Sequence, residues 1–342
     1  MICRVFSLRS VAFCALLLSV LPALGEQKPK KDNLQKPLAG PRATALRVTW
    51  LYIAPDQGSQ KVDRVQTGRE MVVAEKSGPW IRVYANTDVQ EVSEKDAPLI
   101  GAPQDAPPPI SGWMEARGVV IETTPNGDQV LMGEAANEEA LANDPRGPAH
   151  AAQTARLLYR RLAEMYPDSP LAPEAAWRAA DILWQIQKAD VSTRPSSREK
   201  EAYMREQMDE DEMKKILKFY PRTRQAALAA YELIDNKLCG DWQGQTKCPE
   251  KESDYFEKYA AEYPDGPRTA QALYQAVYRQ AVLVDMFNAD ENDKKAESAK
   301  AHVHDLAARM KDKFAQSDYT ARALATAFKI DQGIPVYGID RQ

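Results

Sequence analysis

Residues 158–169, LYRRLAEMYPDS, contain a helical pattern together with its end, and they decide the fold of the longer half of the chain. Leu158, Leu162 and Met165 are spaced i, i+4 and i+7, which places them on one stripe of a helix. Tyr166 precedes Pro167, and proline lacks a backbone N–H and disfavours helical dihedral angles in the residue before it. The stretch therefore predicts an amphipathic helix that ends at Tyr166.

The same boundary recurs along the chain. Tyr-Pro returns at Tyr220 and Tyr263, and Phe314 begins a weaker copy without proline, at spacings of 54, 43 and 51 residues. Aromatic residues follow the three tyrosines eleven positions later, and we expect them to fill the space between paired helices: Trp177, Tyr231 and Tyr274. The pattern predicts an all-α domain of helical hairpins over residues 150–332, followed by a C-terminal tail at 333–342.

This half resembles the divergent tetratricopeptide-type (TPR-like) repeats of periplasmic proteins, notably the outer-membrane assembly lipoprotein and Tol-Pal coordinator families. Ideal repeats of this class run to about 34 residues, so these hairpins are stretched. We assign the extra length to a loop at 190–198, a charged helix at 199–211 and a polar segment at 288–297. The resemblance implies stacked hairpins whose surface receives a protein partner.

Three tyrosines within the hairpins, Tyr255, Tyr278 and Tyr319, have two interpretations. They either contact that partner or pack between helices.

The preceding part of the chain, residues 44–133, has the pattern of short β-strands. Segments rich in β-branched and aromatic residues at 47–52, 62–65, 70–75 and 80–84 alternate with turns that contain Gly and Pro. Such spacing predicts a small all-β barrel or sandwich. We also expect a turn at 125–128 with one more strand at 130–132, and a hinge over 134–149.

These strands resemble a bacterial SH3 (SH3b) domain over residues 45–122. The matching pieces are 51–56, 67–70, 78–84 and 111–114, although the usual Asn-Val-Arg-Ser opening is absent. An acidic, proline-rich insertion at 91–109 interrupts the pattern. The resemblance implies an SH3-like barrel that binds cell-wall peptides or serves as a docking module.

Four aromatic residues of this module are candidate ligand-binding residues: Tyr52, Trp80, Tyr84 and Trp113. The alternative is that they pack the module, because a small β-domain needs large apolar side chains to bury enough area.

The first 25 residues have the layout of a secretory signal peptide. Arg4 and Arg9 precede an uncharged apolar run at 11–21, and small residues follow. That run is shorter than the roughly 20 apolar residues that a membrane-spanning helix needs, and no lipoprotein cysteine stands at the cleavage point. We expect a periplasmic or secreted protein without stable membrane insertion after signal cleavage, with a disordered linker at 26–43. The alternative is that the first 25 residues stay on the chain as an uncleaved anchor.

Cys239 and Cys248 are the two cysteines that would remain after cleavage, and an oxidising compartment permits them to pair. They enclose a polar, glycine-containing stretch with no histidine nearby. The spacing predicts a structural disulfide, with two free thiols or a reactive pair as the alternatives.

Composition and motifs exclude several function classes. The 342 residues carry a net charge of −4, which gives no electrostatic reason to expect nucleic acid as a partner. No zinc-binding, phosphate-binding, dinucleotide-binding or serine-hydrolase motif occurs, so we predict no catalytic residue, no metal and no cofactor. The acidic run at 206–212 is typical of a solvated helix face.

The sequence therefore favours a multidomain, non-enzymatic adaptor of the cell envelope. Its helical repeats would bind envelope proteins or peptides, and its SH3b module would bind a protein or a wall component such as peptidoglycan. Two alternatives stay open: a cell-wall hydrolase with an unrecognised carboxylate site, and a purely structural periplasmic protein.

Overall fold

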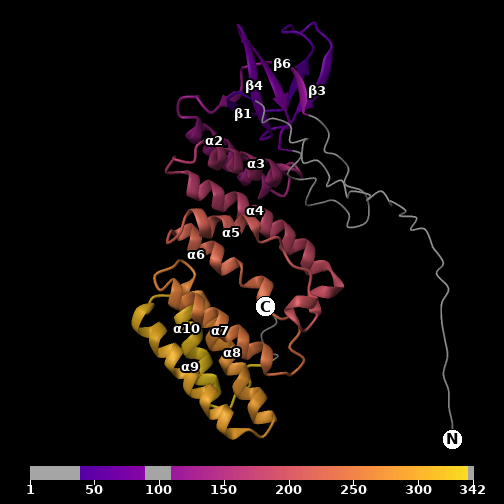
Figure 1. The fold of residues 1–342 in the computed structure, drawn as a ribbon. Helices are drawn as coiled ribbons and strands as arrows, with labels where there is room; N and C mark the ends of the chain where they lie inside the picture. Colours follow the sequence, from indigo (N-terminus) through magenta and orange to yellow (C-terminus); the bar gives the residue numbers. More distant parts are fainter. Residues whose placement is uncertain (1–38, 89–108, 338–342) are drawn as a thin grey trace, which may run out of the picture. The chain divides into compact units, whose positions relative to one another are not determined.

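A computed structural model describes residues 39–88 and 109–337, and these residues belong to one compact unit (Figure 1). The expected signal peptide at 1–25 and most of the insertion at 91–109 lie outside the described residues. So do residues 26–38 of the expected linker and 338–342 of the tail. Within the described part, a small β-sheet is followed by helices, which confirms the predicted order of a β part and a helical part.

Seven antiparallel strands form the sheet. Their bounds are β1 Arg42–Ala45, β2 Thr49–Tyr52, β3 Lys61–Val65, β4 Glu70–Ser77, β5 Trp80–Ala85, β6 Ile110–Glu115 and β7 Val119–Ile121. The strand order is β3-β2-β6-β5-β4-β1-β7. The SH3-like barrel stays a prediction.

The core of the sheet consists of the side chains on one face of each strand. Leu51, Ile81, Val83 and Met114 are among its fully buried members. They alternate along their strands with polar and aromatic residues, as the period of two in a β-strand requires. Gly112 of β6 is buried on the same face as Met114, and a Cβ there would stand 2.9 Å from the Cβ of Leu51, so the two strands need a glycine to approach this closely.

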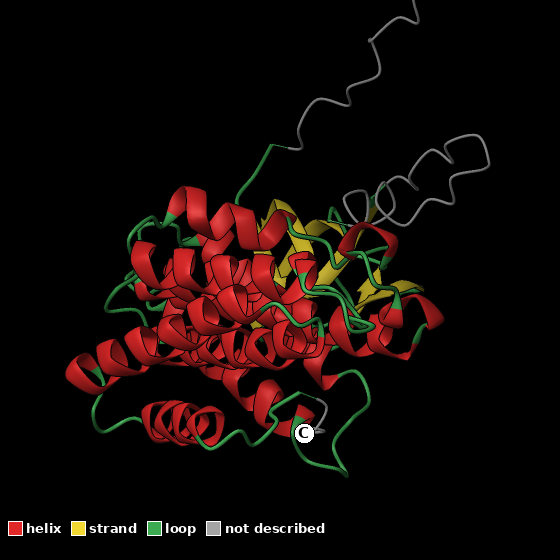
Figure 2. Ribbon diagram, turned by 90° about the horizontal axis from the view of Figure 1, so that it is seen from below, coloured by secondary structure: helices red, strands yellow, loops and turns green. Residues whose placement is uncertain are grey.

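The described part contains nine α-helices (Figure 2). Their bounds are α2 Gly127–Ala142, α3 Ala151–Met165, α4 Ala172–Thr193, α5 Asp211–Phe219, α6 Arg224–Glu232, α7 Lys247–Glu262, α8 Thr269–Ala289, α9 Asp293–Lys313 and α10 Asp318–Asp331. Consecutive helices pack in pairs, among them α3 with α4, α5 with α6 and α7 with α8.

The predicted helix ends are confirmed at all four boundaries. Tyr166, Tyr220, Tyr263 and Phe314 each cap the C-terminus of a helix, with φ between −122° and −127°. Each backbone N–H still donates to the carbonyl four residues earlier. The proline that follows the tyrosines cannot continue the helix, so the chain turns and the next helix begins.

Three local predictions were wrong. Residues 130–132 are not a strand but belong to α2, whose Leu131 and Ala135 are buried against α3. The hinge expected at 134–149 is accordingly helical as far as Ala142. The charged helix expected at 199–211 is also absent: this segment contains a short 3₁₀ turn, Ala202–Met204, and α5 begins only at Asp211.

The sheet shares a core with the first helices. Val120 of β7 packs in one cluster with Leu131 of α2 and Leu158 of α3. The hydroxyl of Tyr166 donates to the carbonyl of Ile121 at 2.8 Å, and a Cβ at Gly127 would lie 2.0 Å from that hydroxyl. The helical boundary tyrosine thus fixes the end of the sheet, and the glycine leaves room for it.

Candidate functional site

The four candidate aromatic residues lie on one face of the sheet. Tyr52 of β2 is directly opposite Trp113 of β6, and Trp113 is opposite Arg82 of β5. Trp80 and Tyr84 are two positions from Arg82 in either direction, so they project from the same face as Arg82. None of the four belongs to the apolar cluster on the other face. The structure therefore brings all four candidates together.

Their burial separates them into two roles. Trp80 is 9% exposed, and the ring of Tyr52 meets it edge to face with the ring centroids 5.7 Å apart. Tyr52, Tyr84 and Trp113 are only partly buried. Trp80 is thus the buried residue of this face and packs against Tyr52, while the other three leave part of their ring surface accessible.

The sequence prediction missed Trp50, which is the most exposed tryptophan on this face at 37%. The Lys61 ammonium lies 4.5 Å from its ring centroid and the Arg64 guanidinium 5.1 Å from it, within the range of cation–π attraction. The available signal was the alternation in β2: Trp50 and Tyr52 are two residues apart and must share a face.

A shallow hollow of about 200 Å³ lies beside these rings. Trp50 and Tyr52 form one wall, and Gln57 donates a hydrogen bond from its amide to the Glu115 carboxylate on the other side. The rings can stack on a flat ligand, and the hydrogen-bonded amide and carboxylate beside them can form hydrogen bonds with the polar edge of that ligand. We call this surface the aromatic face, defined by Trp50, Tyr52, Tyr84 and Trp113.

An ion-pair network joins the sheet to α3. The Arg161 guanidinium on α3 is 1% exposed, and its nitrogens lie 2.9 Å from Glu164, 3.5 Å from Glu70 on β4 and 3.7 Å from Asp88. Burial raises the pKa of the Asp88 carboxyl, although Arg161 and Arg69 act against this. A charge buried this deeply is stable only while its partners remain in place. The network therefore couples the position of the sheet to α3.

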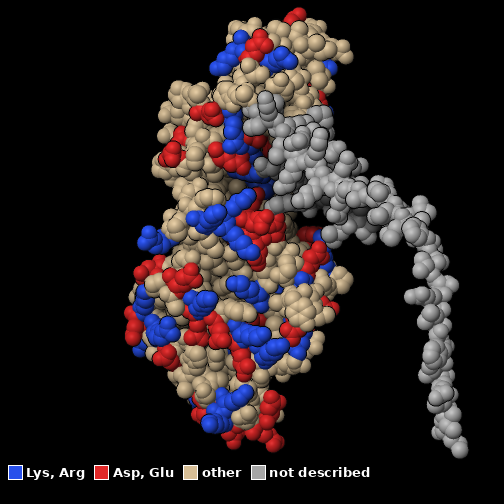
Figure 3. Space-filling view, viewed as in Figure 1, with Lys and Arg blue, Asp and Glu red and all other residues tan. Residues whose placement is uncertain are grey.

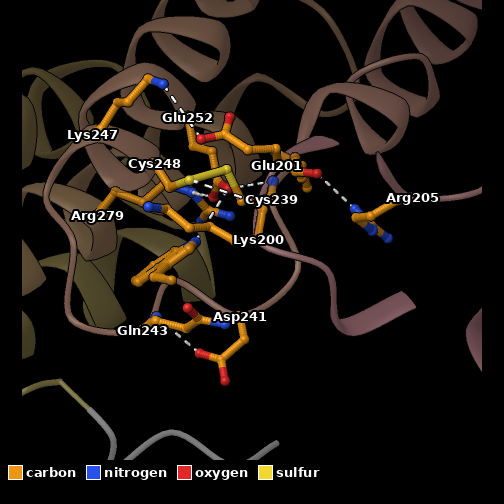
Figure 4. Close-up of a disulfide and its surroundings, with 12 residues drawn as sticks. Lys200, Glu201, Arg205, Cys239, Asp241, Gln243, Lys247, Cys248, Glu252 and Arg279 are labelled. Carbon is orange, nitrogen blue, oxygen red and sulfur yellow. Dashed lines mark hydrogen bonds and ion pairs between the residues drawn. A yellow bond between two sulfur atoms is a disulfide. The ribbon is translucent and has the colours of Figure 1, made fainter. Parts of the chain in front are cut away.

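Cys239 lies in the loop before α7 and Cys248 lies in the first turn of α7; their sulfur atoms are 2.08 Å apart and their Cα atoms are 6.1 Å apart. Figure 4 shows the disulfide against the segment at Lys200 and Glu201 and beside Glu252. Glu252 accepts hydrogen bonds from the backbone N–H of Cys239 at 2.8 Å and from Arg279 on α8 at 2.8 Å. The geometry is that of a structural cross-link among these segments, with no feature of a redox site.

Arg279 completes this cluster. Its guanidinium stands 4.6 Å from the ring centroid of Phe256 and 5.7 Å from that of Trp242, whose indole N–H also donates to Glu252 at 3.2 Å. Trp242 stacks in turn on Tyr337, with the ring centroids 6.3 Å apart. The loop closed by the two cysteines is thereby fixed to α7, α8 and the residues after α10.

The three hairpin tyrosines are all packing residues. Tyr255, Tyr278 and Tyr319 are partly buried against the core of α7–α10, and Tyr319 lies 5.9 Å from Tyr274 between ring centroids. The structure therefore favours inter-helix packing over a contact with a partner for these residues.

Glu232, at the end of α6, is a carboxyl group in a buried environment. It is 8% exposed, and burial together with the neighbouring Asp235 raises its pKa to about 7. Among the described residues, no group of metal-binding side chains that could hold an ion occurs. The protonation of Glu232 links the stability of the fold to pH.

Comparisons with known proteins were made for the whole chain. No protein-family model matches it, and no curated protein matches it. Among solved structures, a de novo designed helical repeat protein aligns with 60% of this chain and 94% of its own, at 14% sequence identity and a TM-score of 0.23. Agreement of this degree carries no argument about fold or function. Among the described residues, no helix has the length and apolar character needed to cross a bilayer.

Proposed function

We propose that this protein is an exported adaptor of the bacterial cell envelope that acts by binding and catalyses no reaction. In this proposal the sheet is an SH3b-like module, the helices are TPR-like hairpins, and residues 1–25 are a signal peptide that directs the chain to the periplasm. The observation that carries the proposal is the aromatic face, where one exposed ring and three partly buried rings lie on the side of the sheet opposite its apolar core.

Aromatic rings that gather on one surface point to binding more than single exposed rings do. Trp50 is 37% exposed and Tyr52, on the same face of β2, is partly buried. Aromatic residues are also the side chains most enriched where proteins bind partners. The aromatic face therefore fits a ligand with flat or apolar groups and polar edges, such as a wall peptide or an exposed protein segment.

The shared core supports an adaptor with two surfaces at a fixed distance. Because Val120 and Arg161 connect the sheet to α2 and α3, the sheet is held against the helices. A rigid connection of this kind lets two weak contacts act together without the entropy cost of a flexible linker.

The test is co-sedimentation of the purified protein with insoluble peptidoglycan, and capture of envelope proteins, with the original chain and a Trp50→Ala/Tyr52→Ala variant. We expect retention of peptidoglycan or of a defined envelope protein by the original chain, and a loss of about ten-fold or more in the variant. Retention of neither by the original chain would falsify the adaptor proposal. Release of soluble wall fragments would favour the hydrolase instead.

A further inference from the structure

A second exposed surface lies on the helices, at the end of α5 and in the turn after it. We call it the α5 strip and define it by Lys215, Lys218, Phe219 and Arg222, all of which are exposed. Phe219 is 63% exposed, and the Lys218 ammonium lies 5.3 Å from its ring centroid. An exposed phenylalanine flanked by cations is not accounted for by the packing of α5 against α6.

The α5 strip lies between two cavities. The first has a volume of about 610 Å³ and is lined by Lys215, Phe219 and residues of α3 and α4; its floor is apolar, with Ala163, Ala179 and Ile216. The second, of about 560 Å³, is lined by Arg222 and by the next Tyr-Pro turn at Tyr263 and Pro264. Each cavity is the gap between neighbouring hairpin turns, and each is large enough to accept a bulky side chain.

The two cavity linings carry both signs of charge, and Glu262 and Arg224 accompany Arg222 in the second. The carboxylates that line the cavities are mostly bound by cations of the chain itself: Glu164 lies 2.9 Å from Arg161, Glu212 lies 2.6 Å from Arg156, and Asp265 lies 2.8 Å from Lys313. In contrast, Lys215, Lys218 and Arg222 form no ion pair with any residue in the described ranges. A chain of net charge −4 therefore presents cations without carboxylate partners here.

Arg222 is held in an uncommon backbone conformation. Its φ is +62°, in the left-handed region that favours glycine or asparagine, and the turn places it in the lining of the second cavity. The equivalent positions in the neighbouring Tyr-Pro turns are Asp168 and Asp265, which are acidic. The arginine thus reverses the charge of the turn beside the second cavity.

We propose that the α5 strip docks an acidic peptide segment of a partner protein, with an apolar side chain of that segment entering the first cavity. This inference rests on the proposed adaptor function and names the chemistry of the helix-bound partner. Acidic side chains would pair with Lys215, Lys218 and Arg222, and Phe219 would cover the inserted side chain. Figure 3 shows Lys, Arg, Asp and Glu intermixed over the face it presents, without the broad single-sign field that a nucleic acid or an anionic membrane attracts.

The test uses fluorescein-labelled peptides of about twelve residues and fluorescence anisotropy with the full chain. One peptide repeats Glu-Glu-Phe, the second repeats Lys-Lys-Phe, and the third repeats Glu-Glu-Ser. We expect binding of the first alone, because it supplies both the charge and the apolar side chain. Raising the salt concentration should weaken that binding, since exposed charges are screened.

Variants locate the binding. We expect Phe219→Ala, and separately Lys215→Glu/Arg222→Glu, to weaken binding of the Glu-Glu-Phe peptide by about ten-fold or more. The matched control is Lys294→Glu/Lys311→Glu on α9, which reverses two other exposed lysines and should leave binding unchanged. Circular dichroism of each variant establishes that it remains folded.

Each other outcome overturns the inference. Failure of the Glu-Glu-Phe peptide to bind, equal binding of the lysine peptide, or equal affinity in all variants contradicts docking at the α5 strip. Binding of vesicles that contain phosphatidylglycerol, without binding of the peptide, would assign the strip to a lipid surface. These results leave the adaptor proposal standing, because the aromatic face and envelope capture are measured separately.

Discussion

At the scale of single residues, tryptophans on one face of the sheet have different environments. Trp80 is nearly buried beneath Tyr52, whereas Trp50 is 37% exposed beneath two cations. In the sequence, both are aromatic residues in strands. A residue that packs the module and a residue that binds a ligand would both be aromatic, so residue type does not distinguish the two roles. Only the register of β2, β5 and β6, set by pairing across the sheet, separates the supporting ring from the exposed ones.

This difference makes a prediction about stability. Trp80→Ala should lower the free energy of unfolding by about 3–5 kcal/mol, because it removes a large buried side chain and leaves a cavity. Trp50→Ala should cost about 1 kcal/mol or less, the scale of an exposed cation–π contact. Urea denaturation followed by circular dichroism measures both. Equal losses would show that the aromatic face is a packing surface.

Glu232 makes a prediction about pH. Its pKa rises from an ordinary value of 4.5 to about 7 on folding, so between these values the folded state binds a proton that the unfolded state has released. Stability should therefore fall as the pH rises through this window and level off above about 7. At about pH 8 the buried charge costs up to roughly 3 kcal/mol.

Glu232→Gln should remove that cost. We expect the variant to be more stable than the original chain near pH 8 and to differ little near pH 5, where the original carboxyl is protonated in the fold. Thermal unfolding at the two pH values measures the difference. Glu297→Gln on the exposed side of α9 is the matched control and should be neutral at both. A gain that is the same at both pH values would rule out titration as its cause.

At the scale of elements, the helix ends could be predicted because their cause is local. A proline one residue ahead fixes the dihedral preference of each boundary tyrosine, whatever the rest of the chain does. The start of α2 could not be predicted in this way. Its Leu131 and Ala135 are buried against α3, which follows later in the chain, and residues 130–132 alone do not indicate that contact. The charged segment at 199–211 failed as a helix for a related reason, because it is bound to the loop before α7. The N–H of Gly240 donates to the carbonyl of Glu199, and Arg205 donates to the carbonyl of Leu238.

The loop closed by Cys239 and Cys248 yields a prediction at this scale. A Cys239→Ser/Cys248→Ser variant should unfold at lower urea concentration, with a loss of about 2–3 kcal/mol, because the cross-link restricts a ten-residue loop in the unfolded chain. The reductant-treated original chain should show the same loss, and the variant should not respond to reductant. A variant as stable as the oxidised original would mean that Glu252 and Arg279 hold the loop without the disulfide.

The buried pair beside that loop is expected to behave differently from an exposed one. Arg279→Ala should destabilise the protein by about 3–5 kcal/mol, because Glu252 is left as a buried charge without its cation. Arg279→Met/Glu252→Leu should recover much of this loss by replacing both charges with apolar groups. If the double variant is no more stable than the single one, the remaining hydrogen bonds of Glu252 to the loop carry the stability instead.

At the scale of the whole molecule, the sheet and the helices are connected by contacts that no pattern in the sequence indicates. Hydrophobic periodicity changes from two to 3.6 along the chain, and that change suggests two parts with a hinge between them. The change in periodicity does not indicate that Arg161 on α3 forms ion pairs with Glu70 and Asp88, because these two residues are distant in the sequence and belong to the β part of the chain. The division into a sheet domain at 44–133 and a helical domain at 150–332 stays a prediction, to be tested by whether the two parts unfold together.

Arg161→Ala tests that coupling. The substitution removes the cation shared by Glu70, Asp88 and Glu164, although Arg42, Arg69 and Arg160 remain paired with them. We therefore expect a loss of about 2–3 kcal/mol. Hydrogen exchange should show lowered protection on both sides of the network, in β1 and β4 and in α3. Arg194→Ala, which removes an exposed arginine paired with Asp190 and Glu206, should cost under about 1 kcal/mol and leave both regions protected. If Arg161→Ala lowers protection in α3 alone, the sheet is an independent module. That result would contradict an adaptor with two surfaces at a fixed distance and favour one whose sheet moves relative to the helices.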